Sequence, residues 1–327
     1  MSSRKVEQHA IINFFIYFGV SCFIVLIPWQ VIRDYPFVDI INYVARYNLM
    51  IENDSAFGFA QVGSIKGYIF SEALWAYFLY IAGKFNLSPY LFLYSVSFLC
   101  CFLISWFTIS RIKSLVYAIL LINPLLIDLV MSQQRSALMF VMVLAAIACY
   151  ERHKIIFFLL FCVSFSVHMS SIILFSFLTL SMLFGKFTFH KNENVNTLII
   201  FQIIMFGSLV VIVGQDAVLA IIGDRRAYSN SGSQSLIYAS AWGALLVLFI
   251  VFSKHERNGL FFFTVSLMSL FVISTLFNAY SSRYLAFAFP FILIYLSHLR
   301  DEIRLPFLSI ILSYILFQWA LWLQLFS

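Results

Sequence analysis

Two polar side chains interrupt long apolar runs of this chain, and each could take part in chemistry. Arg135 stands in Ser-Gln-Gln-Arg-Ser between two apolar runs, with Gln134 beside it. An arginine at a helix end can reach the membrane surface, whereas a deeper arginine is costly and usually functional. Arg135 is therefore either a helix cap or a cation that binds an anionic ligand, and Gln134 could satisfy a polar neighbour or contact that ligand.

His168 is the second such residue. It lies between Phe-Ser-Val and Met-Ser-Ser in the middle of an apolar run, whereas the other histidines lie in or beside charged loops. An imidazole has an ordinary pKa of about 6.5 and can accept a proton near neutral pH. His168 is thus a candidate general base, with a hydrogen-bonded core histidine as the alternative.

Two carboxylates could act beside these residues. Glu72 interrupts a weakly apolar segment in Phe-Ser-Glu-Ala-Leu-Trp, where a carboxylate must be paired or protonated. It could be a structural partner of an arginine, an orienting group or a base. Asp39 lies in a long polar stretch, where a solvated loop residue is the plain alternative to a catalytic one.

Three further arginines could share an anionic ligand with Arg135. Arg225 and Arg226 lie in a second polar stretch, and Arg283 stands in Tyr-Ser-Ser-Arg-Tyr at the start of a late apolar run. The helix dipole disfavours a cation at a helix start, so Arg283 points to a ligand or an acidic partner. Arginine forks match phosphate oxygens, which makes phosphate or pyrophosphate the expected ligand class.

Several other kinds of site leave no pattern in the sequence. It contains no phosphate-cradling glycine loop, no nucleophile elbow and no zinc motif. We therefore expect no metal and no cofactor, and ATP-driven transport is unsupported. The formal net charge is +6, but the basic residues stand in small groups between apolar runs. That pattern indicates membrane topology rather than nucleic-acid binding.

The composition predicts an all-α, polytopic integral membrane protein. Of the 327 residues, 63% are hydrophobic and 10% are charged, whereas soluble chains carry about 25% charged residues. A spanning helix needs about 20 apolar residues, so we expect about 10–12 transmembrane helices in a single domain over residues 1–327. The apolar runs are 10–32, 89–109, 114–131, 135–150, 155–184, 197–214, 235–253, 259–277, 284–299 and 305–326, with a weaker run at 69–83.

Charged clusters between the runs predict the orientation, because Lys and Arg concentrate in cytoplasmic loops. All the clusters fit the cytoplasmic side if segment 69–83 is re-entrant or broken and if 155–184 holds two short crossings that turn near His168. The polar stretches 33–68 and 215–234 then lie outside the cytoplasm. This topology brings the candidate residues to one outer face. A plain crossing by 69–83 would instead move two of the clusters outside.

The middle of the chain resembles the EpsG/Wzy family of polysaccharide polymerases. Gln-Gln-Arg135-Ser-Ala-Leu is followed by a charged turn at 151–154 and then by Phe-Ser-Val-His168-Met-Ser-Ser. These segments are similar to the arginine motif of the family and to its later apolar-His-x-Ser segment. Gln134 precedes the arginine rather than following it, a departure that bears on subfamily and on sugar specificity.

The flanking segments resemble the family as well. Asp39 and Tyr43 match an aspartate–tyrosine pattern that follows the first helix, and the late Ser-Arg283-Tyr segment also fits. The Glu-Pro motif of the family corresponds to Glu72 and Ala73, without the proline. The resemblance covers most of the chain.

This resemblance implies an O-antigen or exopolysaccharide polymerase, a membrane glycosyltransferase of the bacterial inner membrane. Its donor and its acceptor would be oligosaccharide repeat units carried on undecaprenyl pyrophosphate, joined at the periplasmic face. Membrane lipid and a chain-length regulator protein are further partners that the family implies, and nucleic acid is not.

Glycosyl transfer from a lipid pyrophosphate gives each candidate residue a role. Negative charge builds up on the departing pyrophosphate, where arginines would stabilise it, and the acceptor hydroxyl needs a base. The expected pyrophosphate or substrate ligands are Arg135, Arg283, Arg225, Arg226 and Gln134. The candidate catalytic residues are His168, Glu72 and Asp39.

Three other functions stay open on the residues alone. A lipid-linked oligosaccharide flippase would need a cationic cavity through the whole membrane, whereas the charges here gather at one face. A membrane O-acyltransferase would also use an intramembrane histidine, and a position of His168 at the inner face would favour this function. Another lipid-phosphate-sugar glycosyltransferase would use acidic residues of the first outer loop, such as Asp34 and Asp39.

Overall fold

The computed structural model describes residues 3–57, 72–150, 152–187, 189, 191–222, 236–253, 257–277 and 282–324. Within these ranges the chain forms helices and no strand, which confirms the predicted all-α class. The helices are α1 Ser3–Leu26, α2 Trp29–Ile32, α3 Val38–Glu52, α5 Ala73–Lys84, α6 Pro89–Ile109, the 3-10 helix η1 Leu115–Leu121, α7 Pro124–Met131, α8 Gln134–Cys149, α9 Lys154–Val167, α10 Ser171–Phe184, α11 Glu193–Ile222, α12 Leu236–Phe252, α13 Gly259–Leu276, α14 Ser282–His298 and α15 Asp301–Trp322.

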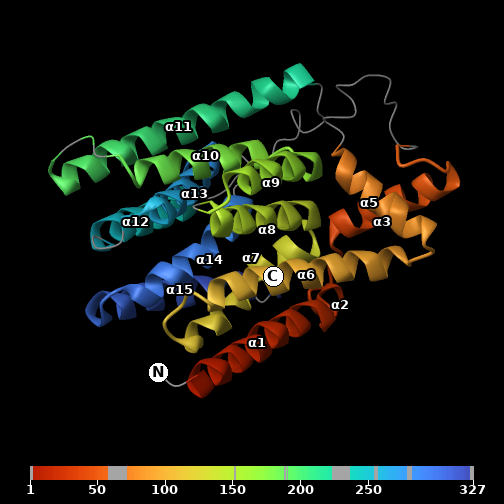
Figure 1. The fold of residues 1–327 in the computed structure, drawn as a ribbon, viewed down its shortest axis with the longest axis horizontal. Helices are drawn as coiled ribbons and strands as arrows, with labels where there is room; N and C mark the ends of the chain where they lie inside the picture. Colours follow the sequence, from red (N-terminus) through yellow and green to blue (C-terminus); the bar gives the residue numbers. More distant parts are fainter. Residues whose placement is uncertain are drawn as a thin grey trace. The chain divides into compact units, whose positions relative to one another are not determined.

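The chain forms two compact units. The first comprises Met1–Leu174 and Leu308–Ser327, and the second comprises Phe175–Phe307. Within the first unit α1 lies along α6, α6 packs against α8, and α8 lies along α9 (Figure 1). This row of packed helices carries the candidate residues of the central motifs.

Helix α3, within the first polar stretch, packs against α5. The hydroxyl of Tyr47 on α3 donates to the carbonyl of Leu87 just after α5, at 2.6 Å. Lys84 on α5 forms an ion pair with Asp54, and the hydrogen bond from Lys84 lowers the pKa of the Asp54 carboxyl. Part of the predicted outer stretch 33–68 is therefore helical, although residues 58–68 lie outside the described ranges.

A sharp break joins α7 to α8. The side chain of Asn123 accepts a hydrogen bond from the amide of Leu126 at 3.1 Å, an N-cap that starts α7 and divides the apolar run 114–131. The axes of α7 and α8 then meet at 103°. Across this break the side-chain amide nitrogen of Gln133 donates a hydrogen bond to the carboxylate of Asp128 at 2.8 Å. The run 114–131 is therefore not one continuous span. Helix α8 begins at a residue, Gln134, that is buried in the first unit.

The run 155–184 holds two helices that meet at His168, as the sequence predicts. Helix α9 ends at Val167 and α10 begins at Ser171. His168 between them has an extended backbone, with φ −156° and ψ 126°. The amide of Ser171 donates to the carbonyl of His168 at 3.0 Å and closes the turn. The predicted turn near His168 is confirmed.

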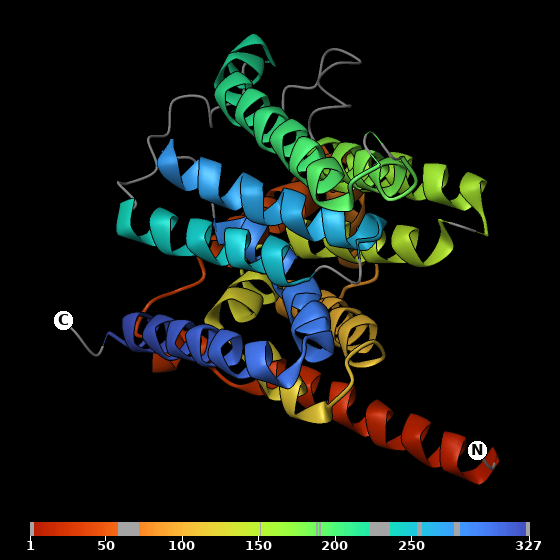
Figure 2. The same ribbon diagram turned by 90° about the vertical axis from the view of Figure 1, so that its left-hand side faces the viewer.

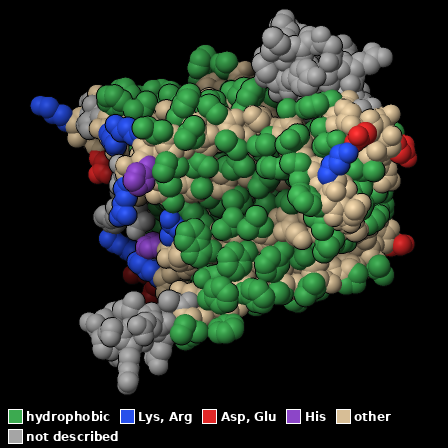
Figure 3. Space-filling view, turned by 45° about the vertical axis from the view of Figure 1, so that its right-hand side comes forward, with side chains coloured by type: hydrophobic (Ala, Val, Ile, Leu, Met, Phe, Trp, Pro, Cys, Tyr) green, Lys and Arg blue, Asp and Glu red, His purple; other side chains and the backbone are tan. Residues whose placement is uncertain are grey.

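Several described helices are apolar enough to cross a membrane. Four are also long enough, namely α6, the segment Glu193–Gly214 of α11, α13 and α15, and the bent pair of α7 and α8 makes a fifth if it counts as one span. Large hydrophobic side chains are exposed on them and on shorter helices, including Phe15 at 65% and Ile155 at 77%. Hydrophobic side chains also dominate the face drawn in Figure 3. Such a surface requires lipid, so this is a multi-pass membrane protein, while the number of 10–12 spans stays a prediction.

Helix α13 is the centre of the second unit. Every side chain from Phe261 to Thr275 is buried, and α11, α12 and α14 pack against it (Figure 2). Asn258 caps its start by accepting hydrogen bonds from the amide of Phe261 at 2.9 Å and from the hydroxyl of Tyr295 at 2.7 Å. The second unit is therefore organised around α13, which is buried along most of its length.

Two glycines allow the end of α10 to approach the start of α13. A Cβ on Gly185 would lie 2.5 Å from the backbone nitrogen of Gly259, and a Cβ on Gly259 would lie 2.9 Å from Cα of Met182. Backbone atoms cannot move aside as flexible side chains do. We expect Gly185→Ala to destabilise the protein by roughly 1–3 kcal/mol, because it overpacks this contact.

The measurement is the melting temperature of the purified protein in detergent. Gly214→Ala is the matched control, since nothing lies within 4 Å of a Cβ at that position. A melting temperature of Gly185→Ala equal to that of the control would show that the helices do not approach so closely.

Candidate functional site

The carboxylate of Glu72 lies between a guanidinium and an imidazole. Its Oε2 forms an ion pair with Nη1 of Arg135, and its Oε1 is hydrogen-bonded to Nδ1 of His168. The Glu72 side chain is 7% exposed, that of His168 is 2% exposed and that of Arg135 is 19% exposed. Together with Tyr43, described below, these residues form what we call the Glu72 cluster. Three of the predicted site residues therefore meet in one place within the first unit.

The backbone of Glu72 is left-handed, with φ 57° and ψ 53°. For a residue other than glycine this conformation costs about 1–2 kcal/mol, and such strain concentrates at functional sites. Glu72 is also the N-cap residue of α5, where the positive end of the helix dipole stabilises a carboxylate. The strained turn thus places a buried negative charge where α5 begins.

Arg135 lies in the first turn of α8, where the helix dipole disfavours a cation. The carboxylate of Glu72 offsets this repulsion. The preceding Gln134 is fully buried, and its amide nitrogen donates to the carbonyl of Leu93 at 3.1 Å and to Oγ of Ser97 at 2.8 Å. Gln134 therefore ties the start of α8 to α6 and fixes the direction in which Arg135 projects.

Tyr43 of α3 completes the cluster. Nε of Arg135 donates to the Tyr43 hydroxyl at 3.0 Å, and the guanidinium lies 5.2 Å from the centre of the Tyr43 ring. The ring of Trp75 from α5 packs edge-on against Tyr43 at 5.2 Å, and both rings are 2% exposed. Two edges of the guanidinium are thus held by different groups, which locks its plane.

His168 follows the last residue of α9, and its amide donates to the carbonyl of Ser164 at 2.9 Å. The carboxylate of Glu72 on Nδ1 favours the tautomer that carries a proton there, and makes Nε2 the basic nitrogen. A carboxylate, an oriented imidazole and a fixed guanidinium are together able to remove a proton and to stabilise a nearby anion.

The other predicted site residues are placed differently. Asp39 is half-buried in the first turn of α3, one helical turn before Tyr43, and is outside the contacts described for the cluster. Arg283 opens α14 in the second unit. Arg225 and Arg226 lie outside the described residues. Within the described ranges no three His, Cys, Asp or Glu side chains are grouped so that they could hold a metal ion.

Sequence reasoning did not single out Asp128, the carboxylate of α7. It accepts the hydrogen bond from Gln133 that bridges the break before α8, two residues from Arg135. Burial lowers the pKa of the Arg33 guanidinium, and the charge of Asp128 acts in the opposite direction. The available signal was a carboxylate inside an apolar run, the same signal that drew attention to Glu72.

We expect Tyr43→Phe to lower activity about tenfold, because Nε of Arg135 loses its acceptor while the ring remains in place, a change of roughly 1–1.5 kcal/mol. The measurement is the turnover rate of the purified protein at saturating substrate. Tyr47→Phe on the same helix is the control, since its hydroxyl bonds to the Leu87 carbonyl outside the cluster. Equal activity of Tyr43→Phe and wild type would mean that Tyr43 does not help to orient Arg135.

Comparison with known proteins gives one result. The model of the EpsG family matches residues 11–326, nearly the whole chain, including every residue of the Glu72 cluster. No curated protein and no solved structure matches the chain. The match confirms the resemblance that the arginine and histidine motifs indicate. The chain therefore belongs to the EpsG family and is a membrane protein of the polysaccharide-polymerase type.

Proposed function

We propose that the protein polymerises O-antigen or a related exopolysaccharide, by joining oligosaccharide repeat units carried on undecaprenyl pyrophosphate at the outer face of the bacterial inner membrane. The observation that carries the proposal is the Glu72 cluster, in which a buried carboxylate joins the arginine and the histidine of the two central motifs. Burial of ionisable groups such as Glu72 and His168 in a membrane protein is costly and is typical of functional sites.

Arg135 retains the means to bind an anion although it is paired. A guanidinium has five N–H donors. Nε of Arg135 donates to the hydroxyl of Tyr43, and Nη1 of Arg135 is paired with Glu72. In the described part of the chain no contact uses Nη2, and the Arg135 side chain is 19% exposed. Its remaining donors can therefore bind a pyrophosphate oxygen, with Arg283, Arg225 and Arg226 as further proposed ligands.

The proposed reaction is a direct glycosyl transfer. A hydroxyl oxygen of the acceptor sugar forms a bond to the anomeric carbon of the donor, and the bond from that carbon to the pyrophosphate oxygen breaks. The pyrophosphate leaves with the electron pair, and Arg135 stabilises its growing negative charge. The hydroxyl proton passes to Nε2 of His168, and Glu72 stabilises the imidazolium. Asp39, one turn from Tyr43, is the alternative base.

The test is deletion of the gene followed by electrophoresis of the surface polysaccharide. We expect the ladder of chain lengths to disappear while a single repeat unit stays attached to its acceptor, because the repeat is still made and exported. The wild-type gene should restore the ladder, and a gene encoding Glu72→Gln should not.

Other outcomes would each reject the proposal in a different way. Loss of the single repeat unit as well would indicate a flippase or an earlier transferase. An intact ladder with altered acetylation would indicate an O-acyltransferase.

A further inference from the structure

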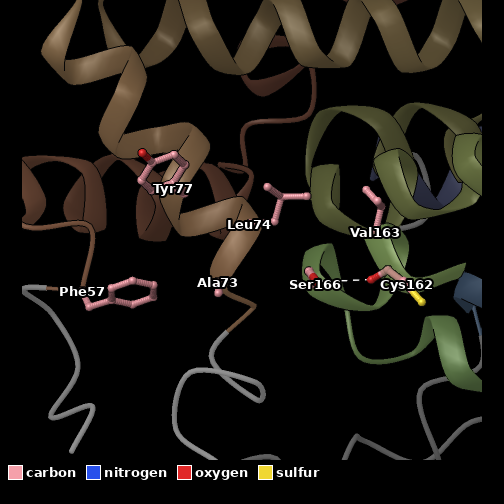
Figure 4. Close-up of a pocket in the computed structure, with 7 residues that line it drawn as sticks. All are labelled: Phe57, Ala73, Leu74, Tyr77, Cys162, Val163 and Ser166. Carbon is pink, nitrogen blue, oxygen red and sulfur yellow. Dashed lines mark hydrogen bonds between the residues drawn. The ribbon is translucent and has the colours of Figure 1, made fainter. Parts of the chain in front are cut away.

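An apolar groove opens between α5 and α9. Its volume is about 510 Å³. It is lined by Phe57, Ala73, Leu74, Tyr77, Cys162, Val163 and Ser166 (Figure 4). None of these side chains is charged, and the proposed reaction uses none of them.

Two lining residues of the groove are close neighbours, in the sequence, of residues of the Glu72 cluster. Ala73 directly follows Glu72, and Ser166 stands two residues before His168. Helix α5 starts at the cluster, α9 ends at it, and the two helices pack together. At 1.5 Å per residue, the walls reach roughly 8–9 Å along the helices from Glu72 and His168. The same pair of helices therefore carries the buried charges at one end and the apolar groove beside it.

The walls of the groove suit an apolar chain. Tyr77 is 50% exposed and Val163 is 40% exposed, so the groove is accessible from the surface of the first unit. The hydroxyl of Ser166 donates to the carbonyl of Cys162 at 3.2 Å (Figure 4), which satisfies its donor within α9. A hydrocarbon chain would bury apolar surface there, at about 25 cal/mol per Å².

We propose that this groove binds the first isoprene units of the prenyl chain while Arg135 binds the pyrophosphate to which that chain is attached. The inference rests on the proposed function and adds the site of the lipid. The ligand must combine an anionic head with an apolar chain that begins directly at the head, because the charges and the groove are adjacent. A prenyl pyrophosphate has this form, whereas a phospholipid places a glycerol ester between its phosphate and its chains.

Cys162 provides a direct probe, because it lines the groove and is exposed. The experiment measures how fast a maleimide modifies Cys162 in the full-length protein in phosphatidylcholine nanodiscs, resolved by peptide mass spectrometry. Cys149 at the end of α8 does not line the groove and is the internal reference. The probes are undecaprenyl pyrophosphate, inorganic pyrophosphate and phosphatidylglycerol.

We expect undecaprenyl pyrophosphate to slow modification of Cys162 about tenfold at a concentration roughly ten times its Kd, because the unoccupied fraction falls as 1/(1 + [L]/Kd). Modification of Cys149 should not change, and neither inorganic pyrophosphate nor phosphatidylglycerol should protect Cys162. Unchanged modification with undecaprenyl pyrophosphate would overturn the proposal. Equal protection by phosphatidylglycerol would also overturn it, since the groove would then accept any membrane lipid.

A groove-filling variant separates the lipid site from the reaction. We expect Val163→Trp to raise the Kd at which undecaprenyl pyrophosphate protects Cys162 about tenfold, the effect of roughly 1.4 kcal/mol. Ile155→Trp, on the same helix but outside the groove and 77% exposed, should bind as wild type does. Full protection in Val163→Trp would contradict the proposed lipid site. Failure of the proposed function would instead appear as protection of Cys162 without polymer formation.

Discussion

Arg135→Ala is expected to abolish long-chain polymer while the protein still accumulates in the membrane. The variant loses the donors proposed for the pyrophosphate, and removal of one such donor in other enzymes costs about 10²–10³ in rate. It also leaves Glu72 buried without its ion-pair partner, which destabilises a protein by roughly 3–5 kcal/mol. The measurement combines electrophoresis of surface polysaccharide with quantification of the protein in membranes.

Two further variants make this test specific. Arg135→Lys keeps the charge but loses the planar fork, so we expect it to bind Glu72 and still to polymerise poorly. Arg111→Ala removes an arginine at the end of α6, where Nη1 donates to the carbonyl of Phe107, and should leave the polymer unchanged. Normal polymer at a normal level of Arg135→Ala protein would exclude Arg135 from the reaction.

Glu72→Gln should lower the polymerisation rate about 10²–10⁴-fold, the range found when a general base loses its function. Glutamine has the same shape but no charge, so Arg135 loses its counter-ion, and one of the two acceptor oxygens that Arg135 and His168 use becomes an NH2 donor. His168→Gln should have a similar effect. The double variant should be little worse than either single one, because the two residues act as a unit.

The pH profile tells this role from a structural one. A base must be deprotonated before it accepts a proton, so the wild-type rate should fall as the pH is lowered. In His168→Gln this acid limb should be absent from the residual activity. A residual rate that keeps the wild-type acid limb would show that another group is the base, and Asp39 would be the next residue to test.

The sequence alone led to Glu72, Arg135 and His168 because each is a charged or titratable group within apolar surroundings. The cost of burying such a group in a membrane makes its presence informative even without a structure. The turn at His168 followed from the charged clusters, because keeping all of them on the cytoplasmic side requires two short crossings within the run 155–184. The structure confirms this turn and brings the three side chains together.

Two other features were not predicted from the sequence, one because it depends on a contact between distant segments and one because its signal is short. The side-chain amide nitrogen of Gln134 donates hydrogen bonds to the carbonyl of Leu93 and to Oγ of Ser97 on α6. These partners depend on how α8 packs against α6, which the sequence does not specify locally. The run 114–131 has the length of a span, but the local cap at Asn123 divides it. Such a cap is a signal of a few residues that hydropathy averaged over a window conceals.

The helices that converge on the Glu72 cluster are short. Helix α5 has 12 residues and α9 has 14 residues, or roughly 18 Å and 21 Å at 1.5 Å per residue. The hydrocarbon core of a bilayer is about 30 Å thick. A bilayer adapts to short hydrophobic elements by thinning beside them. If these helices meet the bilayer side by side, we expect the membrane to be thinner around the cluster, so that lipid headgroups and water approach the buried charges. The lipid composition of the membrane would then tune how easily a substrate enters.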